Sequence, residues 1–212
     1  MFEWLIDYMK AIYNSRITEE ENIQISVDNR GFCYGDGLFE TIVTGPHRIN
    51  LINRHLDRLK RHSQQLKIHL PNSFLTHLED QIKKLASINQ FAEDYRTKLM
   101  LWRKAGGLYA PDNNEYEFLI TQKANYKPLI NKAHRIDICR SVHNSFSTHS
   151  HIKSLNALTY VVAGQEMKER NLDEVIILNE QGQLSETHLG NLFWITDEQL
   201  FTPKLTTGCI EG

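Results

Sequence analysis

Cysteine is scarce in this sequence, and so are long runs of hydrophobic residues. The three cysteines, Cys33, Cys139 and Cys209, form no close pair along the chain. This odd and dispersed set argues against a disulfide framework and against a cysteine-based zinc knuckle, and it favours a reducing cytosol. No apolar run approaches membrane-spanning length, and Glu3 and Asp7 interrupt the stretch that a secretory signal would occupy. We therefore expect a soluble cytoplasmic protein with no membrane partner.

An excess of charge of either sign is also lacking. The chain has 24 Lys and Arg against 26 Asp and Glu, a formal net charge of -2. Such a balanced chain exerts no general attraction on nucleic acid, so we expect no nucleic-acid partner. The composition is otherwise that of a globular protein, with 41% hydrophobic and 24% charged residues over 212 positions. This composition argues against intrinsic disorder, and one large or two small domains are expected.

Hydrophobic spacing predicts the secondary structure along the chain. In the first half it predicts strands at 37–43, 98–102 and 117–121, a helix over 51–68, and a second helix after Pro71 whose buried stripe is Phe74, Leu75, Leu78, Ile82 and Leu85. In the second half it predicts a helix over 154–170 and strands at 135–142, 175–179, 183–186 and 192–196. Because helices and strands do not alternate regularly, the pattern favours the α+β class.

Two polar stretches separate these elements. Residues 29–37 are rich in turn-forming residues and are expected to form a loop that leads into the first strand. Residues 123–132 have no clear period and contain Pro128, so we predict an interdomain linker there. This boundary gives an N-terminal domain over 1–122 and a C-terminal domain over 133–212. Gln181 and Gly182 are expected to form a hairpin turn between two strands of the second domain.

Three ionisable residues could serve a site. Lys153 begins the predicted helix over 154–170, where the helix dipole is expected to lower the pKa of its amine, and a neutral amine can form a Schiff base. Arg58 lies on a basic helix face, which either binds a phosphate or is an ordinary solvent-exposed face. Glu186 is either an exposed edge charge or a buried partner of a cation. None of these patterns alone decides between a functional residue and an ordinary surface charge.

Histidines gather before Lys153, at His143, His149 and His151. No carboxylate or cysteine cluster accompanies them, and paired loop histidines are the simpler explanation. No metal site is therefore predicted.

Several motifs together resemble the class IV, fold-type IV pyridoxal-phosphate enzymes, which include branched-chain aminotransferases, D-amino-acid aminotransferases and aminodeoxychorismate lyases. The motifs occur in the family's order: NRGFCYGDGLFETI, NRHLDRL, HIKSLNAL, LSETHLGNLFWI and LFTPKLTTGCIEG. The resemblance implies a small α/β N-terminal domain, a larger C-terminal domain on a barrel-like sheet, pyridoxal 5'-phosphate as cofactor, and a homodimer. Family members continue beyond the last motif, so the C-terminal domain is expected to be incomplete at Gly212.

The resemblance also implies roles for individual residues. Lys153 matches the lysine that forms the Schiff base with the cofactor, and Arg58 matches the arginine that holds its phosphate. Glu186 matches the acid that pairs with the pyridine nitrogen, and Ile210 matches the residue that packs on the ring. Four further positions are expected to line the substrate pocket: Phe39, Glu40, Arg103 and Leu108. Leu108 stands about where D-amino-acid aminotransferases and aminodeoxychorismate lyases carry an arginine for a substrate carboxylate.

The function implied first is transamination between an amino acid and a 2-oxo acid through a Lys153 Schiff base. The FET motif that contains Glu40 resembles the aminotransferase sequences, whereas KSLNAL resembles the lyase sequences. One alternative is therefore an aminodeoxychorismate lyase that releases pyruvate and forms 4-aminobenzoate. A second alternative is an inactive, family-like binding protein, which the joint presence of Lys153, Arg58 and Glu186 argues against.

Overall fold

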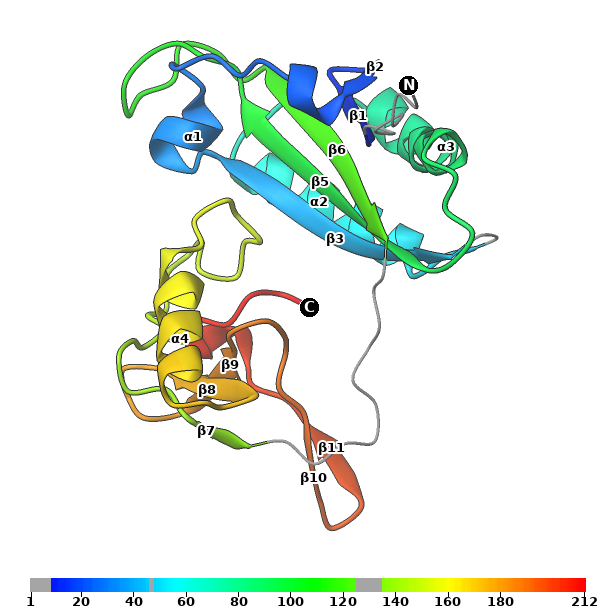
Figure 1. Cartoon of the computed structure of the whole chain (residues 1–212). Helices are drawn as coiled ribbons and strands as arrows, with labels where there is room; N and C mark the ends of the chain where they lie inside the picture. The colour runs from blue at the N-terminus through cyan, green and yellow to red at the C-terminus, as the bar shows by residue number, and fades with distance from the viewer. Residues whose placement is uncertain (1–8, 46–47, 125–134) are drawn as a thin grey trace. The chain divides into compact units, whose positions relative to one another are not determined.

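The computed structural model describes residues 9–45, 48–124 and 135–212 (Figure 1). The chain divides into two compact units, unit 1 (Met1–Pro128) and unit 2 (Leu129–Gly212). Most of the predicted linker, residues 125–132, lies outside the described residues, and its first two residues belong to the last strand of unit 1.

Unit 1 is built on a six-stranded sheet whose neighbouring strands are all antiparallel. In spatial order the strands are β2 (Arg16–Glu19), β1 (Lys10–Tyr13), β6 (Tyr116–Ala124), β5 (Tyr95–Arg103), β3 (Gly37–Gly45) and β4 (Arg48–Ile49). The three strands predicted in this half are confirmed as β3, β5 and β6. The short strands β1, β2 and β4 were not predicted.

Helices α2 (Ile52–Gln65) and α3 (Asn72–Ile88) pack against this sheet, and both were predicted (Figure 1). Along β5, Arg96 and Lys98 are exposed while Thr97 and Leu99 are buried, the alternation of a sheet that is covered on one face. The buried residues of α3 are those predicted from the sequence: Phe74, Leu75, Leu78, Ile82 and Leu85.

The predicted loop at 29–37 is corrected in part, because it contains the short helix α1 (Arg30–Tyr34). The side chain of Asn29 caps this helix by accepting a hydrogen bond from the backbone N–H of Phe32 at 2.9 Å. Gly35 closes the helix in the left-handed region, at φ 65°. A helix of five residues is too short to show a hydrophobic period, which is why the sequence pattern missed it. A single 3-10 turn, η1 (Glu20–Asn22), precedes it.

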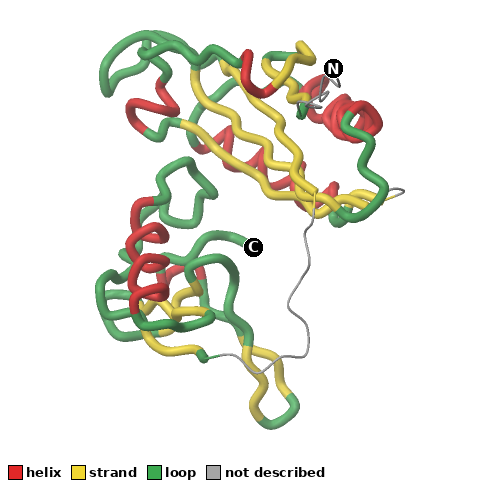
Figure 2. Tube along the Cα trace, viewed as in Figure 1, coloured by secondary structure: helices red, strands yellow, loops and turns green. Residues whose placement is uncertain are grey.

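Unit 2 contains two small sheets among its described residues, and Figure 2 shows that loops make up much of the rest. The first sheet holds β7 (Ile136–Ile138), β8 (Glu174–Leu178) and β9 (Leu184–Thr187), and the second is the hairpin of β10 (Trp194–Thr196) and β11 (Gln199–Phe201). β7 runs parallel to β8, and β8 runs antiparallel to β9. In residues 135–212 the expected barrel-like sheet is therefore represented by separate pieces.

The predicted turn between β8 and β9 is confirmed. The side-chain oxygen of Asn179 accepts hydrogen bonds from the backbone N–H groups of Gln181 at 3.1 Å and Gln183 at 2.8 Å. Gly182 adopts φ 74°, where a side chain would be strained.

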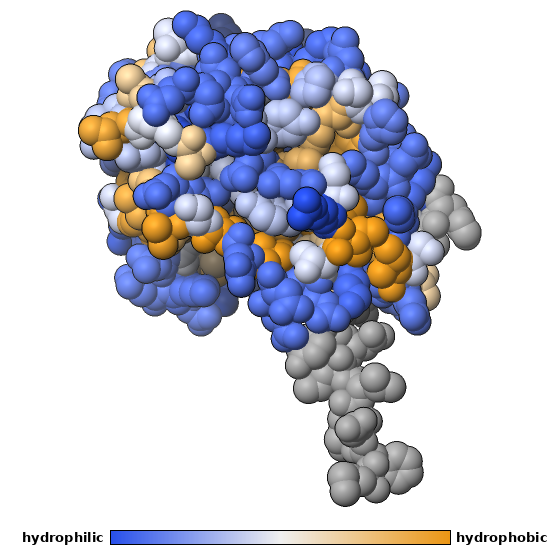
Figure 3. All heavy atoms as spheres, turned by 90° about the horizontal axis from the view of Figure 1, so that it is seen from above, coloured by the Kyte–Doolittle hydropathy of each residue, from blue (hydrophilic) through white to orange (hydrophobic). Residues whose placement is uncertain are grey.

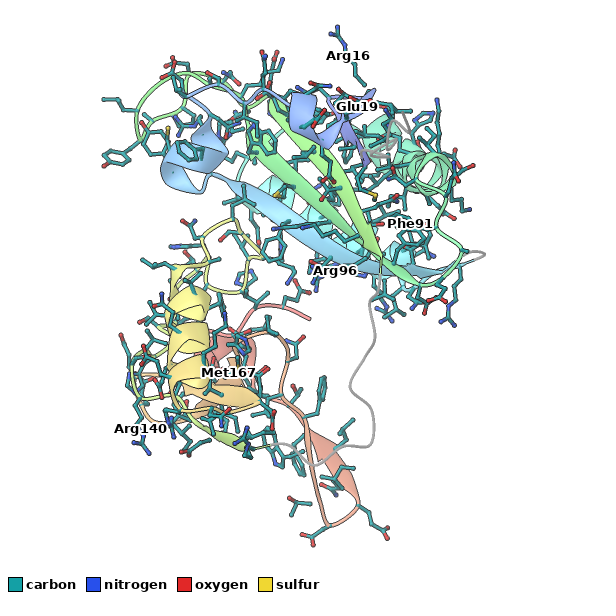
Figure 4. All side chains as sticks on the ribbon, viewed as in Figure 1. Arg16, Glu19, Phe91, Arg96, Arg140 and Met167 are labelled. Atoms are coloured by element: carbon teal, nitrogen blue, oxygen red, sulfur yellow. The ribbon has the colours of Figure 1, made fainter. Side chains whose placement is uncertain are left out.

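The strand predicted at 135–142 ends early, at Ile138. Beyond it the backbone N–H groups of Arg140 and Ser141 donate to the carboxylate of Glu166 at 2.8 to 3.0 Å instead of to a neighbouring strand. The carboxylate thus ends the strand and ties it to helix α4 (Leu158–Glu169). Figure 4 shows Arg140 pointing away from unit 2, and its side chain is 75% exposed.

The helix predicted over 154–170 is α4, which begins four residues later than expected. Leu158 and Val161 are 76% and 52% exposed, so these two apolar residues of the helix do not pack on the core. The buried residues of α4 are Ala163 and Glu166. Ala163 joins a core cluster with Cys139, Val175 and Ile177, against which Met167 and Tyr160 pack.

Mixed helices and strands in no regular alternation confirm the α+β class. No helix within the described ranges is long and apolar enough to cross a membrane. The face drawn in Figure 3 is largely hydrophilic, with hydrophobic residues in smaller patches.

Candidate active site

A buried carboxylate, that of Glu186 on β9, accepts hydrogen bonds from three residues of unit 2. Its side chain is 3% exposed. Oε1 accepts hydrogen bonds from the Asn144 amide and the Tyr160 hydroxyl, each at 2.8 Å, and the backbone N–H of Ile210 lies 3.2 Å from both carboxylate oxygens. Burial raises the pKa of Glu186, although these hydrogen bonds and the charge of Lys153 act in the opposite direction.

Several elements of the chain converge to supply these donors. Tyr160 lies in the first turn of α4, where it packs on the core cluster. Asn144 is held beside β8 because its backbone N–H donates to the carbonyl of Leu178 at 2.9 Å. Ile210 follows the 3-10 turn η2 (Leu205–Thr207) and Gly208, which has φ 88°. A Cβ at Gly208 would lie 2.9 Å from the Ser145 carbonyl oxygen, so only glycine lets the chain pass here.

Lys153 lies in the loop before α4 and is half-buried. Its charge acts on Glu186. The first helical residue is Leu158, so Lys153 does not stand at a helix N-terminus, and the argument from the helix dipole is wrong because that effect is confined to the first turn. What the structure offers Lys153 instead is a neighbouring buried carboxylate.

A polar cavity of about 460 Å³ lies beside this carboxylate. Asn144, Tyr160 and Ile210, the three donors to Glu186, belong to its wall. His143 and His149 line it together with several hydroxyl-bearing residues, namely Ser145, Ser147, Ser150, Ser154 and Thr159. The cavity is formed within unit 2, and it is large enough to admit a small organic molecule.

Arg58 is paired with Glu40 in unit 1. The guanidinium of Arg58, on α2, donates from Nε to Oε1 of Glu40 at 2.8 Å and from Nη2 to Oε2 at 2.5 Å. Nδ1 of His55 lies 2.7 Å from the same Oε2. Burial opposes the charge of the Glu40 carboxyl, but hydrogen bonds from Arg58 and His55 outweigh it and lower its pKa.

Arg103, expected in the substrate pocket, is buried in unit 1. It donates to the Asp36 carboxylate at 2.9 Å, to the Leu66 carbonyl at 2.6 Å and to the Asn114 side chain at 2.5 Å. These contacts join the turn between α1 and β3, the end of α2 and the loop between β5 and β6. Such a set of protein partners indicates that Arg103 stabilises the fold of unit 1.

The loop between β5 and β6 carries Leu108, which is 75% exposed. Nη1 of Arg30 donates to three successive carbonyl groups of this loop, those of Gly106, Gly107 and Leu108, at 3.0, 3.1 and 2.6 Å. Nε of Arg30 also reaches Oδ2 of Asp36 at 2.8 Å. Arg30 thus fixes the loop on which Leu108 stands.

Phe39 lies on the other face of β3 from Glu40, because neighbouring residues of a strand point to opposite faces. The ammonium group of Lys98 lies 5.6 Å from the centre of its ring. Of the residues predicted from the sequence, unit 2 brings together Lys153, Glu186 and Ile210. The other five belong to unit 1: Phe39, Glu40, Arg58, Arg103 and Leu108.

Asn144 and Tyr160 were missed by the sequence analysis. Tyr160, Ala163 and Met167 are three and four residues apart on α4, so their spacing could have indicated that Tyr160 faces inward. No comparable signal marks Asn144, because its position depends on a contact with the distant strand β8.

Comparison with known proteins places these residues in a family. The model of class IV aminotransferases matches residues 37–212. The chain is 29% identical to an aminodeoxychorismate lyase of Bacillus subtilis over 94% of this chain and 69% of that protein. It is 26% identical to a D-alanine aminotransferase of Bacillus licheniformis over 96% of this chain and 71% of that protein.

Solved structures resemble the fold. A branched-chain aminotransferase of Thermoproteus uzoniensis, solved with norvaline, has a TM-score of 0.86 at 23% identity and matches 96% of this chain and 71% of its own. A branched-chain amino acid aminotransferase of T.th., solved with pyridoxamine 5'-phosphate, has a TM-score of 0.83 at 22% identity, over 97% and 70% of the two chains. The fold-type IV architecture is thereby confirmed. With its match over residues 37–212, the chain belongs to the class IV aminotransferases, a family of enzymes that depend on pyridoxal 5'-phosphate.

Proposed function

We propose that this chain transfers an amino group between an amino acid and a 2-oxo acid, with Lys153 as its catalytic residue. The observation that carries the proposal is the presence of Lys153, the buried carboxylate of Glu186 and a polar cavity within one compact unit. Pyridoxal phosphate, when bound, supplies an aldehyde and a ring that withdraws electrons. An amine beside a buried acid fits the aldehyde and the ring nitrogen of such a cofactor.

Each residue of unit 2 would act on a stated atom. The amine of Lys153 would hold the aldehyde of the cofactor and would serve as the base that moves the proton at the Cα of a bound substrate. The carboxylate of Glu186 would hold the N–H of the pyridine ring. Ile210 would pack on the ring, as its place in the cavity wall allows. These assignments need no residue that the structure leaves undescribed.

Arg58 would bind the cofactor phosphate. Its guanidinium already holds one anion, the carboxylate of Glu40, through two hydrogen bonds. A planar guanidinium with several donors suits a phosphate in the same way. Glu40, on strand β3, would then hold the guanidinium of Arg58 in position through these two hydrogen bonds.

Transamination is preferred to the lyase reaction because of Glu40. Its FET motif resembles the aminotransferase sequences, and its side chain is buried against Arg58 in this chain. The lyase reaction remains the second candidate, since the relatives include an aminodeoxychorismate lyase at 29% identity. In that case the same Lys153 would serve the release of pyruvate.

Transfer of a nitrogen isotope distinguishes the two reactions. The protein is supplied with pyridoxal phosphate, ¹⁵N-labelled D-alanine, L-alanine or L-leucine, and unlabelled 2-oxoglutarate. Transamination predicts ¹⁵N-glutamate with at least one donor, and no product with the Lys153→Ala variant. In a parallel incubation, the protein is supplied with aminodeoxychorismate. Release of pyruvate there, together with no isotope transfer from any amino-acid donor, would instead establish the lyase.

A further inference from the structure

The two oxygens of the Glu186 carboxylate are held unequally. Oε1 accepts hydrogen bonds from the Asn144 amide and the Tyr160 hydroxyl at 2.8 Å, and it shares the N–H of Ile210 at 3.2 Å. Oε2 accepts that shared N–H, also at 3.2 Å, while the amide and the hydroxyl are both directed to Oε1. Because a carboxylate oxygen can accept about two strong hydrogen bonds, Oε1 is saturated and Oε2 keeps capacity for another donor.

The donors select the charged form of Glu186. An amide NH₂ and a backbone N–H can only donate, so Asn144 and Ile210 match a carboxylate and not a protonated acid. The Tyr160 hydroxyl could donate or accept, but burial, together with the Glu186 charge, raises the pKa of Tyr160 and keeps it protonated. Since Oε1 already accepts from Asn144, Tyr160 completes a set of donors on that oxygen.

Tyr160 is itself fixed in position. Its ring packs against the core cluster of Cys139, Ala163, Val175 and Ile177, and its backbone belongs to α4. The hydroxyl therefore reaches Glu186 from a helix, while Asn144 reaches it from the loop beside β8. Together they hold the carboxylate from two directions and restrict its rotation.

We propose that Tyr160 is a positioning residue that, with Asn144 and the Ile210 N–H, saturates Oε1 of Glu186 and leaves Oε2 as the acceptor for the N–H of a ligand. The inference deepens the proposed function and rests on it only for the identity of that ligand, a protonated pyridine nitrogen. The arrangement of hydrogen bonds belongs to the protein alone. It can therefore be tested without cofactor.

The test is a pH titration of cofactor-free protein labelled with ¹³C at glutamate carboxyl and tyrosine ζ carbons, in which Glu186→Gln assigns the Glu186 signal. Without the hydroxyl of Tyr160, the anion loses a donor, so the pKa of Glu186 should rise in Tyr160→Phe. Thr159→Val is the matched control, because it removes a neighbouring hydroxyl from the cavity wall without removing a hydrogen bond to Glu186. A Glu186 pKa that stays unchanged or falls in Tyr160→Phe overturns the proposal.

A second measurement needs no variant. In the wild-type protein the ¹³Cζ signal of Tyr160 should follow the titration of the Glu186 carboxyl, with the same midpoint. Independent behaviour of the two signals contradicts the hydrogen bond.

Loading the protein with ¹⁵N-labelled pyridoxal phosphate then tests the ligand. The ring nitrogen signal should be that of a protonated ring in the wild type and shift toward the unprotonated value in Tyr160→Phe. A ring nitrogen that is equally protonated in both contradicts the assignment of Oε2. If the Glu186 titration shifts as expected but the cofactor does not bind, the positioning of Glu186 stands and the proposed function fails.

Discussion

Arg58 and Glu40 face each other in unit 1 through two parallel hydrogen bonds, from Nε to Oε1 at 2.8 Å and from Nη2 to Oε2 at 2.5 Å. The Glu40 side chain is 2% exposed and that of Arg58 is 11% exposed. The residue proposed to bind phosphate is thus one half of a buried ion pair. Any substitution that breaks the pair leaves a charge without its partner in a place from which water is excluded.

Glu40→Gln should destabilise unit 1 by about 2 kcal/mol, since the neutral amide no longer compensates Arg58. Denaturant unfolding measures the loss. Glu79→Gln is the control, because Glu79 pairs with Lys83 on the exposed surface of α3 and should cost less than about 0.5 kcal/mol. Equal effects of the two substitutions would show that the buried pair does not stabilise the fold.

The same pair should make stability depend on pH in the acid range. The folded-state pKa of Glu40 lies below its ordinary value of 4.5, so the contribution is present above that value and is lost as pH falls through the lower one. Unfolding free energies measured between neutral and acid pH should fall less steeply in Glu40→Gln than in the wild type. Identical pH profiles would contradict the lowered pKa.

Much of the fold was predictable because hydrophobic spacing is a local property. The buried stripe of α3, from Phe74 to Leu85, and the strands β3, β5 and β6 follow from it directly. Elements too short to show a period, such as α1, were missed, and one strand was predicted too long because a distant side chain decides where it ends. β7 does not continue to residue 142 because the backbone N–H groups of Arg140 and Ser141 donate to the carboxylate of Glu166, and no local pattern indicates such a contact.

The candidate site was predictable only in part for the same reason. Motifs that resemble a family marked Lys153, Glu186 and Ile210, and unit 2 brings them together. Asn144 and Tyr160 were not predicted as site residues, because their role depends on the atom to which both donate, Oε1 of Glu186. Sharing of this kind is a property of the folded chain and is not visible in residue types.

Asp36 joins two buried arginines, since its Oδ2 accepts from Nε of Arg30 at 2.8 Å and from Nε of Arg103 at 2.9 Å. Asp36→Asn should therefore destabilise the fold by about 3 kcal/mol and release the loop whose carbonyl groups Arg30 binds. Denaturant unfolding and the rate of proteolysis within residues 104–115 measure the two effects. Asp112→Asn, an exposed change in that loop, should alter neither stability nor cleavage rate. A stable Asp36→Asn protein with a resistant loop would refute this interpretation.

Glu166 anchors α4, and its hydrogen bonds to the Ser141 and Arg140 backbone and to Arg170 overcome burial and lower its pKa to about 2. Its stabilising effect should be complete above pH 4.5, the ordinary value, and disappear as pH falls toward 2. Glu166→Gln should cost about 2 kcal/mol at neutral pH by thermal or denaturant unfolding. The exposed neighbour Glu169, changed to Gln, should leave stability nearly unchanged. The prediction is wrong if Glu166→Gln matches the wild type at neutral pH.

The amine of Lys153 is the group on which the proposed chemistry depends, and borohydride reduction tests it most directly. Protein loaded with pyridoxal phosphate is reduced, digested and examined by mass spectrometry. We expect one fixed cofactor on the peptide that contains Lys153, its retention in the exposed-lysine control Lys168→Ala, and its loss in Lys153→Ala. A reduced adduct that persists in Lys153→Ala, or that maps to another lysine in the wild type, would contradict the assignment.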